Sequence, residues 1–379
     1  MHFGNIGTGK TALENTQVDL EGRLQLVERG TEEVITREEL KGILENNTRP
    51  RAYWGFEASG LMHIGMGLVC GRKILDMINA GFDFNVFIAD WHSWINNKLG
   101  GDMENIRTCG EYFIQCFTAL GIPPSKATYS WASDLASKRE YWERVVRIAK
   151  SVSVSRIWRA LPIMGREIDS KEMEGAAAFY PSMQAADIFE LKLDVACAGM
   201  DQRKAHALAR DVADKLGWRK PTCVHTHLVM GLAGAKKMDF GKYDENSQLN
   251  TEISSKMSKS IPESSILIHD QPATIKSKIQ KAYCPPKDLE NNSIIELAQY
   301  VSFPWNGSLH IERPEKYGGP TTYTSFSELE AHYREGKIHP ADLKAAVASS
   351  LTKILEPVRA EFAKNPELLH KVEQMQITR

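Results

Sequence analysis

A histidine lies within a glycine-rich turn near residue 63. The stretch YWGFEASGLMHIGMGLVCG (53–71) opens with an apolar run typical of a strand, continues through small residues at 58–60, and then carries glycines at 65, 67 and 71. A strand, a glycine-rich turn and a helix N-terminus together form a phosphate site, because free N–H groups and the helix dipole face the anion. The stretch therefore predicts a nucleotide site.

Two chemistries fit this turn. The glycine spacing approximates a dinucleotide fingerprint, which would indicate a nicotinamide dehydrogenase. A dehydrogenase has no need of His63. An imidazole at that place could instead donate to phosphate oxygens on which charge builds up during adenylyl transfer. The turn alone leaves both interpretations open.

A second candidate segment is KMSKS, residues 256–260, in which Lys256 and Lys259 stand on either side of Met257 and Ser258. Two ammonium groups on a mobile loop can clamp a triphosphate and stabilise the pyrophosphate that leaves. A solvated basic loop would have the same composition. Together with the His63 turn, the segment favours adenylyl transfer, because a dehydrogenase would leave it unexplained.

Polar residues follow two predicted strands at the point where each strand ends. The apolar run 84–89 is followed by Asp90, Trp91 and His92, and the run 193–198 is followed by Gly199, Met200, Asp201 and Gln202. Open α/β sheets bind ligands just beyond the carboxyl ends of their strands. Asp201 could accept hydrogen bonds from ribose hydroxyls there, and Gly199 would let the backbone approach a base. Ordinary loops are the alternative.

A predicted helix carries the candidate specificity residues. Tyr180, Gln184 and Asp187 stand at positions i, i+4 and i+7, so they share one helix face. Their neighbours are largely apolar or small, and a carboxylate buried among them would need a hydrogen-bond donor. An outward polar stripe is the alternative.

Basic residues are concentrated between 138 and 166, a range with eight lysines and arginines and only two glutamates. Tyr141, Trp142 and Trp158 lie among them. A basic strip with aromatic residues suits an RNA backbone. A solvated helix face explains it equally well. The basic residues are Lys138, Arg139, Arg144, Arg147, Lys150, Arg156, Arg159 and Arg166.

The elements that must position these residues indicate an α/β fold. From Arg51 strands alternate with helices, as in a parallel sheet. We expect a tail and two short helices in 1–50, with Thr36 and Glu39 as a capping box. A nucleotide-binding domain follows in 51–265, with a helical insertion at about 102–190 and the KMSKS loop at 231–260. An α-helical domain follows in 266–379, with 340–364 as its longest helix.

Composition fits an intracellular enzyme of several domains. The chain has 379 residues, a net charge of −1 and six cysteines without a CxxC pair. We therefore expect reduced thiols, a cytoplasmic location, and no signal peptide or membrane span. Residues 4–11, GNIGTGKT, match the P-loop pattern letter for letter. Only three residues precede them, too few for the buried strand that a P-loop needs, so we interpret them as a tail.

The motifs occur together in one family. The His63 turn and KMSKS resemble the signature pair HIGH and KMSKS of class I aminoacyl-tRNA synthetases, although the first reads HIGM here, with Met66 in place of the second histidine. Over roughly residues 35–365 the chain resembles tyrosyl-tRNA synthetases of the archaeal and eukaryotic type. The motifs that carry this resemblance in order are YWGFEASG, ADWH, YPSMQAAD, AGMDQRKAHALAR, KMSKS, RPEKYGG and HPADLK.

The resemblance implies a Rossmann-like parallel-sheet nucleotide-binding domain with a helical insertion and an α-helical anticodon domain. It implies that ATP, bringing Mg²⁺, activates L-tyrosine, that tRNA(Tyr) receives the tyrosyl group, and that the enzyme is a homodimer joined through the insertion. The implied tyrosine site consists of Tyr53, His92, Tyr180, Gln184, Asp187 and Gln202. The implied ATP site consists of Ala58, Ser59, His63, Gly65, Gly199, Asp201, Lys256, Met257, Ser258 and Lys259, with His63, Lys256 and Lys259 as the catalytic residues. The implied tRNA contacts are Arg156, Arg159, Arg203, Tyr317, His339 and Asp342.

Three departures and two related alternatives accompany this resemblance. Besides Met66, Ala58 replaces the proline that is usual in the family before Ser59, and Ala198 replaces a glycine. The loop 234–254 is also longer than is common in the family. A tryptophanyl-tRNA synthetase would share the architecture, but an aspartate in the pocket suits a phenol better than an indole. A non-catalytic RNA-binding relative would agree with the altered HIGM motif.

Overall fold

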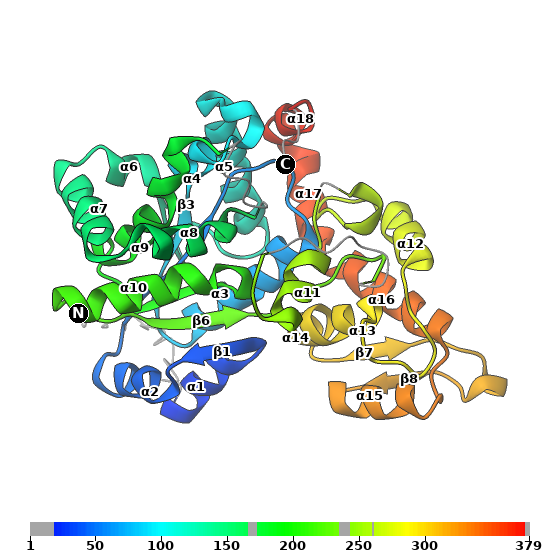
Figure 1. Cartoon of the computed structure of the whole chain (residues 1–379). Helices are drawn as coiled ribbons and strands as arrows, with labels where there is room; N and C mark the ends of the chain where they lie inside the picture. The colour runs from blue at the N-terminus through cyan, green and yellow to red at the C-terminus, as the bar shows by residue number, and fades with distance from the viewer. Residues whose placement is uncertain (1–18, 166–172, 235–242, 260, 376–379) are drawn as a thin grey trace, which may run out of the picture.

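The computed structural model describes residues 19–165, 173–234, 243–259 and 261–375 (Figure 1). Its centre is a six-stranded sheet with the strand order β1-β6-β5-β2-β3-β4. The parallel strands are β2 (Arg51–Phe56), β3 (Asp83–Ile88), β4 (Thr128–Trp131), β5 (Val195–Gly199) and β6 (Thr222–Thr226), and β1 (Thr31–Ile35) runs antiparallel to β6. The predicted α/β class is confirmed.

Alternate residues of the central strand enter different hydrophobic clusters. Trp54 of β2 belongs to one cluster of buried residues and Tyr53 to another. Successive side chains of a strand point to opposite faces of a sheet, so both faces are covered by packed elements. Because the parallel strands share a direction, the segments after β2, β3 and β5 meet at one edge of the sheet.

The N-terminal part contains a strand that the sequence pattern does not predict. Helices α1 (Leu20–Glu28) and α2 (Arg37–Asn46) flank β1, and the expected capping box between Thr36 and Glu39 is present. Strand β1 reads TEEVI and lies at the sheet edge, so its two glutamates, one exposed and one half-buried, hide the usual apolar signature.

The range expected to be mostly helical also contributes one strand. Its helices are α5 (Met103–Ala119), α6 (Ala132–Ala136), α7 (Arg139–Ser151), α8 (Val154–Ala160) and α9 (Tyr180–Glu190). Between α5 and α6, β4 pairs with β3 and completes the sheet. Elsewhere around the sheet lie α3 (Gly71–Asn79), α4 (Asp90–Ile95), α10 (Arg203–Leu216) and α11 (Ser247–Ser255).

The C-terminal part is largely helical, with one hairpin. Its helices are α12 (Pro272–Lys281), α13 (Ser293–Leu297), the π-helix η8 (Ala298–Ser302), α14 (Phe303–Asn306) and α15 (Phe326–Arg334). The hairpin strands are β7 (Leu309–Ile311) and β8 (Thr321–Tyr323).

The expected single helix over 340–364 is wrong. It is divided into α16 (Pro340–Ile354) and α17 (Glu356–Lys364), because Pro357 lacks the N–H that a continuous helix would need. Helices α17 and α18 (Glu367–Glu373) return to α5, beside which Figure 1 shows them. The Tyr112 and Phe362 rings lie 5.5 Å apart at this contact.

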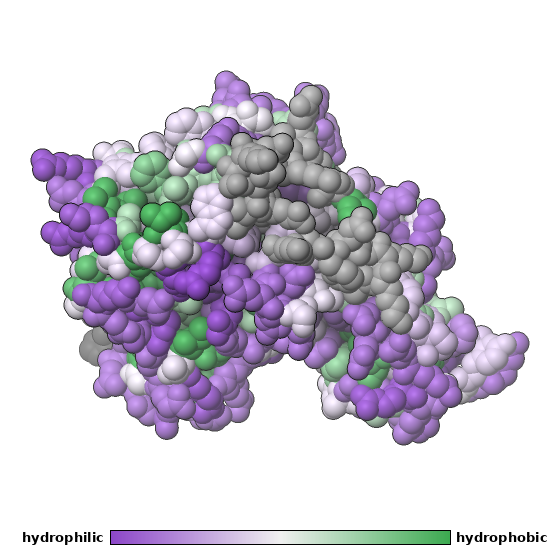
Figure 2. Space-filling model, viewed as in Figure 1, coloured by the Kyte–Doolittle hydropathy of each residue, from purple (hydrophilic) through white to green (hydrophobic). Residues whose placement is uncertain are grey.

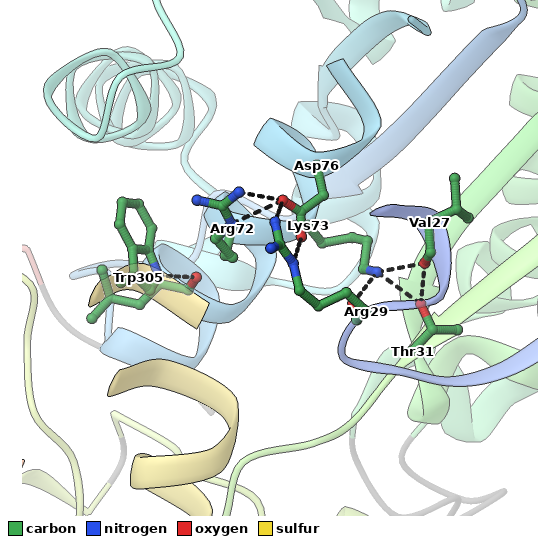
Figure 3. A network of polar contacts seen from close by, with 8 residues as sticks. Val27, Arg29, Thr31, Arg72, Lys73, Asp76 and Trp305 are labelled. Carbon is green, nitrogen blue, oxygen red and sulfur yellow. Dashed lines mark hydrogen bonds and ion pairs between the residues drawn. The ribbon is translucent and has the colours of Figure 1, made fainter. Parts of the chain in front are cut away.

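The helix after the His63 turn is anchored on two sides (Figure 3). The buried Lys73 ammonium of α3 donates to the backbone oxygens of Val27 and Arg29 and to the Thr31 hydroxyl. On the other side, the Trp305 indole N–H donates to the Leu68 oxygen at 2.9 Å. The turn is therefore fixed between the N-terminal segment and the C-terminal helices.

All six cysteines are unpaired thiols. Within the ranges given above, none of the helices combines the length and the apolar character needed to cross a membrane.

A histidine just beyond β6 joins three parts of the chain. The Nε2 of His227 lies 3.3 Å from Glu296 of α13, and its Nδ1 lies 3.5 Å from Glu32 of β1. The ring stacks on Tyr300 of η8, with the centroids 4.1 Å apart. Burial alone would lower the pKa of His227, but the two glutamates outweigh it and raise the pKa to about 9. We name these four residues the His227 joint.

The His227 joint predicts a pH dependence of stability. Because the folded pKa is raised above the ordinary value, its stabilisation is complete below about pH 6.5 and is lost as the pH rises through about 9. We expect His227→Gln to lower the free energy of unfolding by about 1–3 kcal/mol at pH 6.5 and by much less at pH 9.5. Urea titrations at both pH values measure this difference. His310→Gln, at an exposed position of β7, is the control, and a deficit that did not change with pH would contradict the assignment.

Candidate active site

The His63 turn connects β2 to η1 (Gly65–Cys70), a short π-helix that continues into α3. His63 forms an antiparallel bridge with Leu267. A Cβ on Gly65 would lie 3.0 Å from the His63 ring, so the ring position requires glycine there. Burial, together with Lys259 and Lys256, lowers the pKa of His63 to about 3. The imidazole is therefore neutral at physiological pH and can donate only one N–H.

The KMSKS loop is closed over this turn. The Lys256 Nζ lies 2.5 Å from Asp201 Oδ2, and the Lys259 Nζ donates to Ser59 Oγ at 2.8 Å. Burial lowers the pKa of Lys259 to about 8. The structure thus brings four implied ATP-site residues together with His63, from segments almost two hundred residues apart in the chain.

Asp201 is held by the backbone conformation at the end of β5. A Cβ on Gly199 would lie 2.7 Å from Asp201 Oδ1, so glycine lets the carboxylate fold back. A cavity of about 480 Å³ lies beside Asp201, and it is bordered by residues of β1, of the start of α10 and of the segment 243–253. Its lining includes Glu32, Glu33, Pro162, Met200, Arg203, Lys204, Tyr243, Asp244 and Glu252.

Asp187 is buried beside aromatic side chains and a histidine. Its side chain is about 2% exposed; Oδ1 accepts a hydrogen bond from the Tyr141 hydroxyl at 2.8 Å, and Oδ2 lies 3.2 Å from His92 Nε2. Burial favours neutral His92, but the charge and hydrogen bond of Asp187 together with the charges of Glu57 and Asp90 outweigh it and raise the pKa of His92. Burial, and then the Asp187 charge, raise the pKa of Tyr53 well above its usual value. The implied pair Tyr53 and Asp187 therefore lies in one buried site.

Tyr180 of α9 contacts a carboxylate that the sequence analysis missed, and Gln184 contacts Gln202. The Tyr180 hydroxyl donates to Glu57 Oε1 at 2.7 Å, and Asn96 Nδ2 donates to the same oxygen at 2.9 Å. The Gln184 amide donates to Gln202 Oε1 at 3.2 Å, and within the described part of the chain Gln184 Oε1 is buried without a partner. This arrangement leaves oxygen acceptors for a cationic group.

Two polar residues of this site were not assigned to it from the sequence. Glu57 directly follows β2, and its position at a strand end is the signal that could have identified it. Tyr141 was grouped with the basic strip as an aromatic residue on an RNA-binding surface, and that placement is wrong. It is fully buried because Tyr141, Val145 and Ile148 form the apolar face of α7.

The implied tRNA contacts are scattered over the surface. Arg156 pairs with Asp211 at 2.9 Å and Arg203 is bidentate to Glu33, whereas Arg159 is exposed. Tyr317 is 63% exposed, and His339 caps α16 near Asp342. Arg166, Ser260 and the P-loop-like residues 4–11 lie outside the described residues.

Comparison with known proteins shows the family of this chain. The family model of class I tRNA synthetases (W and Y) matches residues 45–254 and 246–356. The chain is 44% identical over 361 residues to the tyrosine–tRNA ligase of Aeropyrum pernix, which covers 95% of this chain and 98% of that protein. It is 43% identical over 358 residues to the tyrosine–tRNA ligase of Saccharolobus solfataricus, covering 94% and 97% of the two chains.

Solved structures give the same result. The tyrosyl-tRNA synthetase of Pyrococcus horikoshii complexed with L-tyrosine superposes with a TM-score of 0.86 and 41% identity, covering 94% of this chain and all of that one. The tryptophanyl-tRNA synthetase of Aeropyrum pernix reaches a TM-score of 0.66 at 20% identity, a likeness of fold alone. The chain therefore belongs to the tyrosine–tRNA ligase family of class I tRNA synthetases.

Proposed function

We propose that this chain activates L-tyrosine with ATP and transfers the tyrosyl group to the terminal ribose of tRNA(Tyr). The observation that carries this proposal is Asp187, a buried carboxylate that contacts Tyr141 and His92, together with the pairing of Lys256 with Asp201. The tyrosine–tRNA ligases of Aeropyrum pernix and Saccharolobus solfataricus match this chain over nearly their whole length, which supports the same substrate.

The first step would be adenylyl transfer. The carboxylate of tyrosine forms a bond to the α-phosphorus of ATP, and the bond to pyrophosphate breaks. Lys256 and Lys259 would stabilise the negative charge on the leaving group, and neutral His63 would donate its N–H to a phosphate oxygen. No side chain needs to act as a covalent nucleophile, so catalysis would depend on position and charge.

Magnesium belongs to the substrate in this proposal. Among the described residues, no group of three or more His, Cys, Asp or Glu side chains is placed to hold a metal ion. Mg²⁺ would therefore arrive with ATP, bound mainly by phosphate oxygens and water.

Specificity for tyrosine would come from both ends of the pocket. Asp187 and Tyr53 would pair with the phenol, which an indole cannot reproduce, so the tryptophan alternative is not favoured. At the other end, the free Gln184 oxygen would accept from the α-ammonium group. The Tyr180 oxygen can also accept there, because its own proton is directed to Glu57.

Exchange kinetics of two variants test the phenol assignment. Asp187→Ala removes a charged acceptor, whereas Tyr53→Phe removes only a neutral hydroxyl. We expect Asp187→Ala to lower the preference for tyrosine over phenylalanine at least about tenfold, through loss of tyrosine activation. The Tyr53→Phe effect should be smaller. ATP–pyrophosphate exchange with both amino acids measures the preference. An unchanged preference in Asp187→Ala would contradict the assignment of Asp187 to the phenol.

The second step would use the exposed part of the basic strip. Arg159 and the 40% exposed Trp158 lie together on α8, and Arg156 is on the same helix. A cationic side chain beside an aromatic ring can bind phosphate and a stacked base.

A paired substitution separates this step from the first. Arg156→Glu with Arg159→Glu should slow tRNA charging and weaken its salt dependence, because phosphate contacts are lost, while ATP–pyrophosphate exchange persists. Charging assays over a salt series measure the slope, with the exposed Arg334→Glu on α15 as the control. A matching loss of both activities would mean that the two arginines serve the fold instead.

A homodimer joined through the helical insertion is the remaining part of the proposal. Val146 of α7 is 51% exposed, Phe179 at the end of η4 (Gly175–Phe179) is 51% exposed, and Trp94 of α4 is 46% exposed. Figure 2 shows hydrophobic residues over the lobe where Figure 1 places α7 and α9. Such a patch is typical of a protein interface.

Sedimentation tests the dimer. We expect the wild type to sediment as a dimer and Val146→Glu to shift it toward monomer, because a charge would be buried at the interface. A Val146→Glu variant that remains a dimer would place the interface elsewhere. A monomeric wild type would exclude the dimer.

A further inference from the structure

Residues 229–232 form a buried segment to which the KMSKS loop is attached. Met230 forms an antiparallel bridge with Lys256. On either side of this bridge, Met257 N–H donates to the Val229 oxygen at 2.7 Å and Gly231 N–H donates to the Ser255 oxygen at 2.9 Å. Any shift of the 229–232 segment would therefore also shift the backbone of Lys256.

The same segment is attached to the C-terminal helices on its other side. The Met230 N–H donates to Glu296 Oε2 of α13 at 2.8 Å. Two further bonds reach Leu232, whose oxygen accepts from Tyr283 N–H at 2.7 Å and from the Ser293 hydroxyl at 3.3 Å. Glu296 of α13 is thus connected to Lys256 through one residue, Met230.

The position of the Glu296 carboxylate is itself fixed by the His227 joint. Its Oε2 lies 3.3 Å from His227 Nε2, and the histidine ring is held between Glu32 and the stacked Tyr300. The raised pKa of His227 keeps this partner charged at neutral pH, and a charged partner makes the contact stronger. A displacement of α13 or η8 would therefore move Glu296 and, with it, the 229–232 segment.

We propose that Glu296 is a positioning residue for adenylate formation: its carboxylate holds the 229–232 segment and thereby sets the place of the Lys256 ammonium beside Asp201. The proposal rests on the proposed function, because it assigns Lys256 to the leaving pyrophosphate. It adds a physical connection between the C-terminal helices and the first chemical step. A misplacement of a catalytic group by about 1 Å can cost about 10²-fold in rate, so a modest shift of the segment is enough.

A double-mutant cycle tests this connection in the full-length protein. Glu296→Ala should slow ATP–pyrophosphate exchange by about tenfold to 10²-fold at saturating tyrosine, with little change in tyrosine binding measured without ATP. Glu296→Gln keeps an oxygen acceptor for the Met230 N–H and should recover part of the rate. Because Glu296 acts through Lys256, adding Glu296→Ala to Lys256→Ala should cause little further loss.

The control is Glu290→Ala, an exposed carboxylate just before α13 that should exchange like the wild type. The proposal would be overturned if the rate losses of the two single variants multiplied in the double variant. It would also be overturned if Glu296→Ala lost tyrosine binding as strongly as it lost exchange rate. A purely structural role would lower the melting temperature of Glu296→Ala without a selective loss of the ATP-dependent rate. A wild type without exchange would contradict the proposed function instead, so the two failures are distinguishable.

Discussion

The nucleotide site places two lysine ammonium groups beside a histidine in a partly buried volume. Lys256 is paired with the Asp201 carboxylate, whereas Lys259 is held by the neutral Ser59 hydroxyl. Burial lowers the pKa of Lys259 to about 8 and that of His63 to about 3, so the protein environment disfavours positive charge on these two residues. A polyphosphate would supply the missing negative charge, and this electrostatic constraint makes the site suited to ATP.

The surrounding fold keeps these groups together. The His63 turn is hydrogen-bonded to the segment that follows the KMSKS loop, since Ile64 N–H donates to the Ile266 oxygen at 2.8 Å. The base of the loop pairs with residues 229–232. Lys73 and Trp305 fix the helix behind the turn from opposite sides. These contacts hold the groups of the site in place, as electrostatic catalysis requires.

Much of this arrangement is predictable from the sequence, and the exceptions have physical causes. Continuous apolar runs identified the buried strands, because parallel strands are covered on both faces. Strand β1 escaped notice because its two glutamates lie at a sheet edge, where burial does not select apolar residues. Tyr141 was misplaced because the charges of α7 dominate its sequence, although the apolar face of that helix points inward. Glu57 was missed because only the three-dimensional structure brings it to Tyr180.

The central claim is that this site activates tyrosine, and wild-type ATP–pyrophosphate exchange with each of the twenty amino acids in turn tests it most directly. The account predicts exchange with tyrosine far above that with any other amino acid, phenylalanine and tryptophan included, because only tyrosine offers a phenol to Asp187. Preferred exchange with a different amino acid would contradict the pocket assignment. Exchange with none would contradict catalysis itself and favour a non-catalytic RNA-binding relative.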